Sequence, residues 1–130
     1  MKEVFVGTYY LGCITQVNLY LRPDTGGNFH CTPDKGELAY IKIGADDGGW
    51  HRMVEVLVHE SMELSYVLQG CRYGADNSIA NDSGAWLFVA DHVKFGECCA
   101  MTGDFLAVAL PAMAKAWKTW KTEAKKQGKK

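Results

Sequence analysis

The stretch of residues 50–69 constrains the fold more than any other part of the chain. Apolar and small side chains recur along it at the spacing of one helical face: Val54, Leu57, Ser61, Leu64, Ser65 and Leu68. Gly70 follows directly, and glycine commonly ends a helix because it adopts a left-handed backbone without strain. The pattern predicts a helix over residues 50–69 whose inner face must be buried by other elements.

The opposite stripe of this helix is polar and charged. It consists of Arg52, Glu55, His59, Glu63 and Tyr66, and apolar residues flank it on both sides. A helix with so little purely polar surface rarely lies free in solvent. We therefore expect another part of the chain to pack on the flanks and to cover part of the face that carries His59 and Glu63.

His59 and Glu63 are placed for joint chemistry on this helix. Residues four apart lie on one face, separated by about 6 Å along the axis, so an imidazole and a carboxylate can hold one cation. Glu60 points elsewhere and could reach a water molecule on that cation. His92, expected where a late strand turns into a second helix, is the best third ligand. Two histidines, a carboxylate and water would form an open zinc site, with Glu60 as the proton shuttle.

The string His59-Glu60-Ser61-Met62-Glu63 resembles the H-E-x-x-H motif of the zincin metallopeptidases. The order of a small sheet, then the motif helix, then a further element is similar to the minimal domains of that class. His59 and Glu60 match the family's first ligand and general base, whereas Glu63 stands in place of its second histidine. The resemblance implies a zincin-like domain with weak or no peptidase activity that acts by binding another macromolecule.

The same residues have a second interpretation without metal. Arg52, Glu55 and His59 also fit ordinary ion pairs at helical spacing. The whole sequence also resembles small phage proteins. The alternative function is therefore a phage-encoded inhibitor that binds a host or defence protein. Trp117 and Trp120 either complete the core or form an exposed patch for such a partner.

Composition narrows the remaining classes. The chain has 130 residues, of which 48% are hydrophobic and 22% charged, as expected for one globular domain over residues 1–122. Seven lysines and one glutamate lie from Lys115 onward, and we expect residues 123–130 to form a frayed basic tail. This tail matches no nucleic-acid motif, whereas the acidic body before it and the aromatic residues favour a protein partner. Five cysteines fit no disulfide or zinc pattern and favour free thiols in the cytoplasm, and no apolar run indicates a membrane span.

The other elements follow from alternation and turn residues. Strands are expected over residues 3–7, 14–22, 28–31 and 37–43, which together form an antiparallel meander. Residues 71–84 form a polar loop or lid, and residues 85–90 a buried strand. Asp91 is then the N-cap of a second helix over residues 92–121 that Pro111 should kink. The predicted fold is α+β: a small antiparallel sheet of three or four strands, packed against a central helix and a long C-terminal helix.

Overall fold

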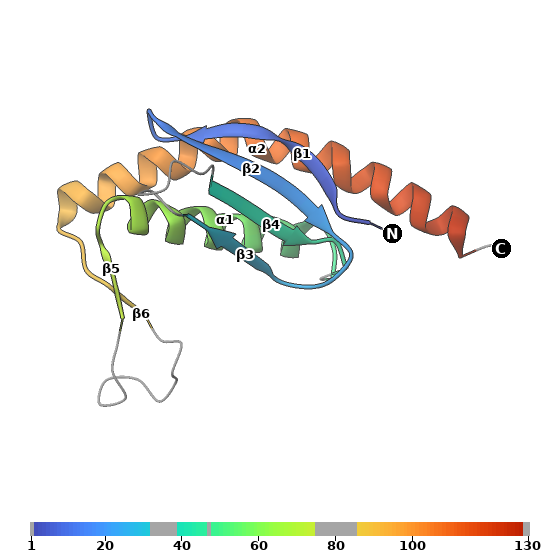
Figure 1. The fold of residues 1–130 in the computed structure, drawn as a ribbon, viewed down its shortest axis with the longest axis horizontal. Helices are drawn as coiled ribbons and strands as arrows, with labels where there is room; N and C mark the ends of the chain where they lie inside the picture. Colours follow the sequence, from blue (N-terminus) through green and yellow to red (C-terminus); the bar gives the residue numbers. More distant parts are fainter. Residues whose placement is uncertain (1, 32–38, 47, 75–85, 129–130) are drawn as a thin grey trace.

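The computed structural model describes residues 2–31, 39–46, 48–74 and 86–128. Within these residues the elements follow one another in this order: β1 (Val4–Leu11), β2 (Thr15–Arg22), β3 (Gly27–His30), β4 (Ala39–Gly44), α1 (Trp50–Leu68), β5 (Arg72–Gly74), β6 (Trp86–Phe88) and α2 (His92–Gln127). A four-stranded sheet, a central helix and a long C-terminal helix confirm the predicted α+β class (Figure 1).

The main sheet has the strand order β1-β2-β4-β3, which corrects the expected meander. β1 pairs with β2 and β3 pairs with β4 in antiparallel fashion, but β2 and β4 are parallel. β2 and β3 are consecutive in the chain but are not paired, because β4 lies between them. The segment that connects β2 to β3 passes over the end of β4 and forms backbone hydrogen bonds with it. The amide of Ala45 donates to the Arg22 carbonyl at 2.8 Å, and the amide of Gly44 donates to the Gly26 carbonyl at 2.8 Å.

Gly44 makes this crossing possible. A Cβ atom at this position would collide with the backbone of Asp24 and Thr25. Because glycine lacks that atom, the β2–β3 connection can lie directly on the end of β4. The mixed sheet thus includes a close approach between the backbone of Gly44 and that of Asp24 and Thr25. Strand periodicity does not reveal this approach.

Both helices pack on the same face of the sheet. α1 contacts β3 and β4, and α2 contacts β1 and β2, so the molecule has two layers (Figure 1). The largest fully buried side chains lie between the layers: Phe105, Leu11, Leu19, Leu21, Ile41, Ile43, Met53, Leu57, Leu64, Met113 and Val17. Burial of this apolar surface is the main stabilising contribution to the fold.

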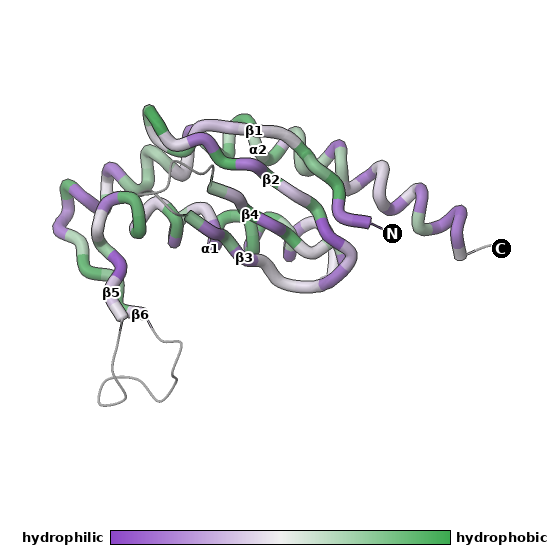
Figure 2. Tube along the Cα trace, viewed as in Figure 1, coloured by the Kyte–Doolittle hydropathy of each residue, from purple (hydrophilic) through white to green (hydrophobic). Residues whose placement is uncertain are grey.

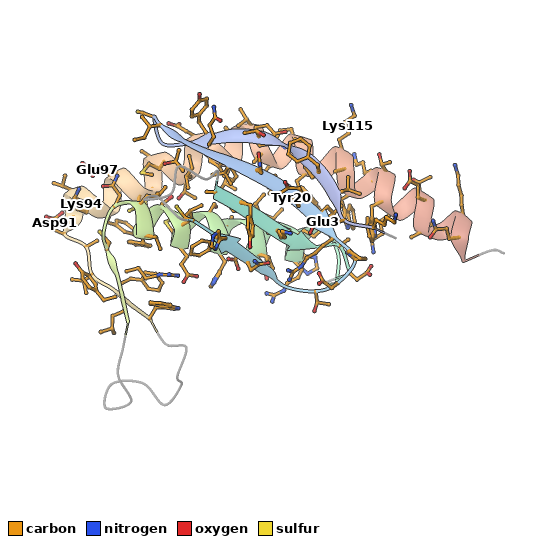
Figure 3. All side chains as sticks on the ribbon, in the orientation of Figure 1. Glu3, Tyr20, Asp91, Lys94, Glu97 and Lys115 are labelled. Carbon is orange, nitrogen blue, oxygen red and sulfur yellow. The ribbon has the colours of Figure 1, made fainter. Side chains whose placement is uncertain are left out.

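The outer face of the sheet carries aromatic and polar side chains. In β4, Ala39, Ile41 and Ile43 are buried whereas Tyr40 and Lys42 lie on the other face, as the alternation predicts. Lys42 Nζ lies 5.2 Å from the centre of the Tyr20 ring and forms an ion pair with Glu3 at 3.0 Å. Tyr20 and Glu3 are labelled in Figure 3.

α2 begins as predicted and extends further. The Asp91 carboxylate accepts a hydrogen bond from the Lys94 amide at 2.8 Å, which confirms the N-cap. The helix continues through Pro111, its two halves run in different directions in Figure 1, and it ends at Gln127 instead of residue 121. The first residues of the expected frayed tail, 123–127, are thus helical.

The inner face of α2 belongs to the core, because Phe105, Ala109 and Met113 are fully buried. The helix also has the length and composition of a membrane-spanning helix, and 28% of its most apolar window is buried. Core helices share that length and composition.

The tryptophans of α2 complete the core. Trp120 is buried, and Trp117 packs against Trp50 with ring centres 6.0 Å apart. The indole Nε1 of Trp117 also donates to the Ala45 carbonyl at 3.4 Å. The sequence predicts that Trp117 and Trp120 either complete the core or form an exposed patch, and in the structure they complete the core. All five cysteines are free, and Cys71 and Cys98 are buried.

β5 and β6 form a separate two-stranded hairpin that extends away from the two layers (Figure 1). The sequence predicted a buried strand over residues 85–90, and this is wrong in one respect: Trp86 and Phe88 are each 47% exposed, and Val89 is 62% exposed. Their aromatic content indicates a strand, but no second layer built from the described residues covers it. The expected loop or lid over residues 71–84 is wrong at its start, because Arg72–Gly74 pair with β6 as strand β5, and residues 75–84 lie outside the described residues.

Candidate functional site

α1 places His59 and Glu63 side by side, as their spacing predicts. His59 Nε2 lies 3.3 Å from Glu63 Oε2. The two side chains differ in environment, because that of His59 is 69% exposed and that of Glu63 only 14%. The expectation that another element covers part of this face is therefore confirmed at Glu63.

Arg72 of β5 is the residue that covers Glu63. Its Nη1 atom lies 2.9 Å from Glu63 Oε1, and its guanidinium group lies 3.8 Å from the centre of the Trp86 ring. The Phe29 ring of β3 lies 5.2 Å away on the same guanidinium. Arg72 thus links α1, β3 and the hairpin. The sequence did not identify it, because the three partners lie on segments far apart in the chain.

The contacts of Glu63 with Arg72 and His59 affect whether a metal ion can bind at the predicted zinc site. Glu63 has one oxygen on Arg72 and the other on His59, so a cation between His59 and Glu63 would have to compete with a guanidinium group. His92 is exposed at the first position of α2. Among the described residues, no three His, Cys, Asp or Glu side chains gather as a metal would require. In the described chain, His59 and Glu63 therefore meet without a third ligand gathered beside them.

Glu60 lies in the interface between α1 and β3. The residue is only 7% exposed, and burial raises the pKa of its carboxyl, although the charges of His59 and Arg22 oppose the effect. Gly27 of β3 provides the space: a Cβ atom there would lie 2.5 Å from Val56 Cγ1 and 3.0 Å from Glu60 Cγ. The expected proton shuttle is thus a buried carboxyl beneath β3.

A cavity of about 320 Å³ opens at this interface. It is lined by Gly26, Gly27, Arg52, Glu55, Val56, His59 and Glu60. Arg52 and Glu55 are exposed at its rim and form an ion pair at 3.0 Å. His59 and Glu60, which the sequence assigned to one metal site, do line a common cavity, whereas Glu63 and His92 are not part of it.

The hairpin and the start of α2 form the other unusual surface. Six of the twelve exposed large hydrophobic residues in the described chain lie here: Tyr73, Trp86, Phe88, Val89, Val93 and Phe95. We call these six residues the hairpin surface. Figure 2 shows hydrophobic residues along the connection from β6 to α2, at the end of the molecule opposite the C-terminus. Asp91, Lys94 and Glu97 lie beside it (Figure 3).

The comparisons with known proteins give no relative. No family model, no curated protein and no solved structure matches this chain. The structure itself defines the class as a two-layer α+β protein with a mixed four-stranded sheet and a separate exposed hairpin.

Proposed function

We propose that this chain acts by binding another protein, and that the hairpin surface makes the contact. The observation that carries the proposal is the exposure of Tyr73, Trp86 and Phe88, which are between 47% and 52% accessible on one short hairpin. Aromatic side chains dominate the energetics of protein interfaces, and exposed clusters of them mark contact sites.

The base of the hairpin supports this role. Arg72 is held by Glu63, and Phe88 packs on Tyr66 of α1 with ring centres 5.1 Å apart. The amide of Val89 also donates to the Cys71 carbonyl at 2.9 Å. Aromatic anchors that are fixed before binding lose less conformational entropy when a partner docks. The hairpin therefore presents its side chains in a defined geometry.

A pair of matched variants tests the proposal. Tyr73→Ala and Tyr10→Ala remove exposed tyrosines of similar accessibility, 52% and 55%, from the hairpin and from β1. Proteins captured from lysate by the wild-type chain are identified, and the affinity of each purified candidate is measured for all three chains. We expect Tyr73→Ala to weaken binding by about 2 kcal/mol, or roughly 30-fold, and Tyr10→Ala to bind like wild type. Equal affinities for all three chains would contradict the assignment.

The zincin-like interpretation is the second candidate, and the contact of His59 with Glu63 at 3.3 Å favours it. Here the chain would bind zinc through these residues with weak or no peptidase activity. Elemental mass spectrometry of protein purified without chelator tests this for wild type, His59→Ala and the control His51→Ala, an exposed histidine on the same helix. Near-stoichiometric zinc that only His59→Ala loses would support it, and no zinc in any sample would contradict it.

A further inference from the structure

A carboxyl group without a protein donor lines the cavity between α1 and β3. Glu60 is only 7% exposed and lines the cavity, and no described residue donates a hydrogen bond to its carboxyl, whose oxygens remain accessible from the cavity. Buried carboxyl groups are normally hydrogen-bonded, because loss of water without compensation is costly. A donor that enters the cavity, from water or from a ligand, can therefore reach this carboxyl.

The nearest cation of the protein does not supply that donor. Arg22 lies close enough to influence Glu60 electrostatically, but its hydrogen bonds go elsewhere. Arg22 Nη1 donates to Asn28 Oδ1 at 2.6 Å, and Nε lies 2.6 Å from Asp24 Oδ1. Arg22 is thus directed to Asn28 of β3 and to Asp24 of the β2–β3 connection. Its buried Nε has no hydrogen-bond partner, and no hydrogen bond joins Arg22 to Glu60.

The walls of the cavity determine which ligand fits. Arg52 at the rim is paired with Glu55, and Glu60 adds a second carboxyl to the lining. Val56 and the two glycines form an apolar and backbone wall beside the carboxyl. No three ligating side chains of the described chain converge here, which disfavours a metal ion and favours a ligand that needs a single carboxylate.

We propose that this cavity binds an organic cation, with an ammonium or guanidinium group on Glu60 and a short apolar stem along Val56. A charge-assisted hydrogen bond would then satisfy the buried carboxylate. The cation is either a small molecule or a lysine or arginine side chain of a bound protein, since both present the same group. This site is separate from the hairpin surface and does not depend on it.

The test uses the complete chain and NMR titration, with the amides of Gly26 and Gly27 as reporters. The probes are n-butylguanidinium, n-butylammonium and the neutral n-butanol. We expect saturable shifts with both cations, with dissociation constants on the order of millimolar, and none with n-butanol. This comparison uses wild type only, so it does not depend on the folding of a variant. Equal shifts with n-butanol, or no shifts with either cation, would overturn the proposal.

Two variants sharpen the result. Glu60→Gln keeps the shape of the side chain but removes its charge, and should weaken cation binding by about tenfold or more. Glu3→Gln, a control on the outer face of the sheet, should leave it unchanged. Unaltered binding by a folded Glu60→Gln chain would overturn the assignment. A five-residue peptide with a central arginine distinguishes the two sources of the cation, and its citrulline analogue is the uncharged control. Tighter binding of the arginine peptide than of n-butylguanidinium indicates a protein side chain. Equal binding of the two indicates a small molecule.

Discussion

β2 and β4 differ from β5 and β6 in what covers them. In the first pair, every second residue from Val17 to Leu21 and from Ala39 to Ile43 is buried, because the two helices form a second layer over that face. In the hairpin, Trp86 and Phe88 are 47% exposed although they are larger and more aromatic than most of the core residues. The residue type of a strand therefore indicates that it is extended, whereas its burial depends on a neighbouring layer.

The hairpin is attached to the body by a small number of specific contacts. Arg72 with Glu63, Phe88 with Tyr66, and the amide of Val89 with the Cys71 carbonyl are the principal ones in the described chain. The two-layer core is held instead by many apolar contacts that act together. We expect the core to control the free energy of unfolding and the hairpin to open independently of it.

The largest difference should appear when one phenylalanine is removed from each region. Phe105 is fully buried in the core, so Phe105→Ala should lower the free energy of unfolding by about 3–5 kcal/mol through lost burial and a cavity. Phe88→Ala removes a ring that is 47% exposed and should cost less than about 1.5 kcal/mol. Urea denaturation of both variants measures this. Similar losses would mean that the hairpin is part of the cooperative core.

A smaller effect is expected at the ion pair that holds the hairpin. Arg72→Ala leaves the Glu63 carboxylate, only 14% exposed, without its guanidinium partner, and should cost about 1–3 kcal/mol. Hydrogen exchange at the Val89 amide should accelerate more than exchange at core amides of β2. Arg52→Ala is the control: its ion pair with Glu55 is exposed, so a cost of about 0–1 kcal/mol is expected. Equal acceleration at Val89 and in β2 would show that Arg72 stabilises the whole fold.

The smallest effect is a pH dependence at Glu60. Burial raises the pKa of this carboxyl in the folded state, so the folded protein holds the proton more tightly than the unfolded chain. Wild type should therefore lose stability as the pH rises from the ordinary glutamate pKa through the raised value. Glu60→Gln should lack this loss and gain stability relative to wild type between acid and neutral pH.

Urea midpoints over that pH range test the prediction at Glu60. Glu55→Gln, with a side chain that is 59% exposed, is the control variant on the same helix. The same trend in both variants would show that the effect does not come from the buried carboxyl. A constant difference between Glu60→Gln and wild type across the range would contradict the prediction.

The candidate site was accessible to sequence reasoning only in part. The helical spacing of His59 and Glu63 correctly predicted that their side chains meet, because four residues on a helix have a fixed geometry. The same spacing did not reveal that Glu60 is buried, since this depends on the close approach of Gly27. Nor did it reveal Arg72, whose partners lie on α1, β3 and β6.

The sequence by itself determined most of the secondary structure and the fold class. The alternation of β2 and β4, the periodicity of α1 and the Asp91 cap of α2 are local patterns, and each fixes backbone geometry within a few residues. Only the tertiary structure decided that β4 lies between β2 and β3, that the hairpin is uncovered, and that Glu60 faces a cavity. These features depend on which distant segments meet, and local periodicity contains no information about that choice.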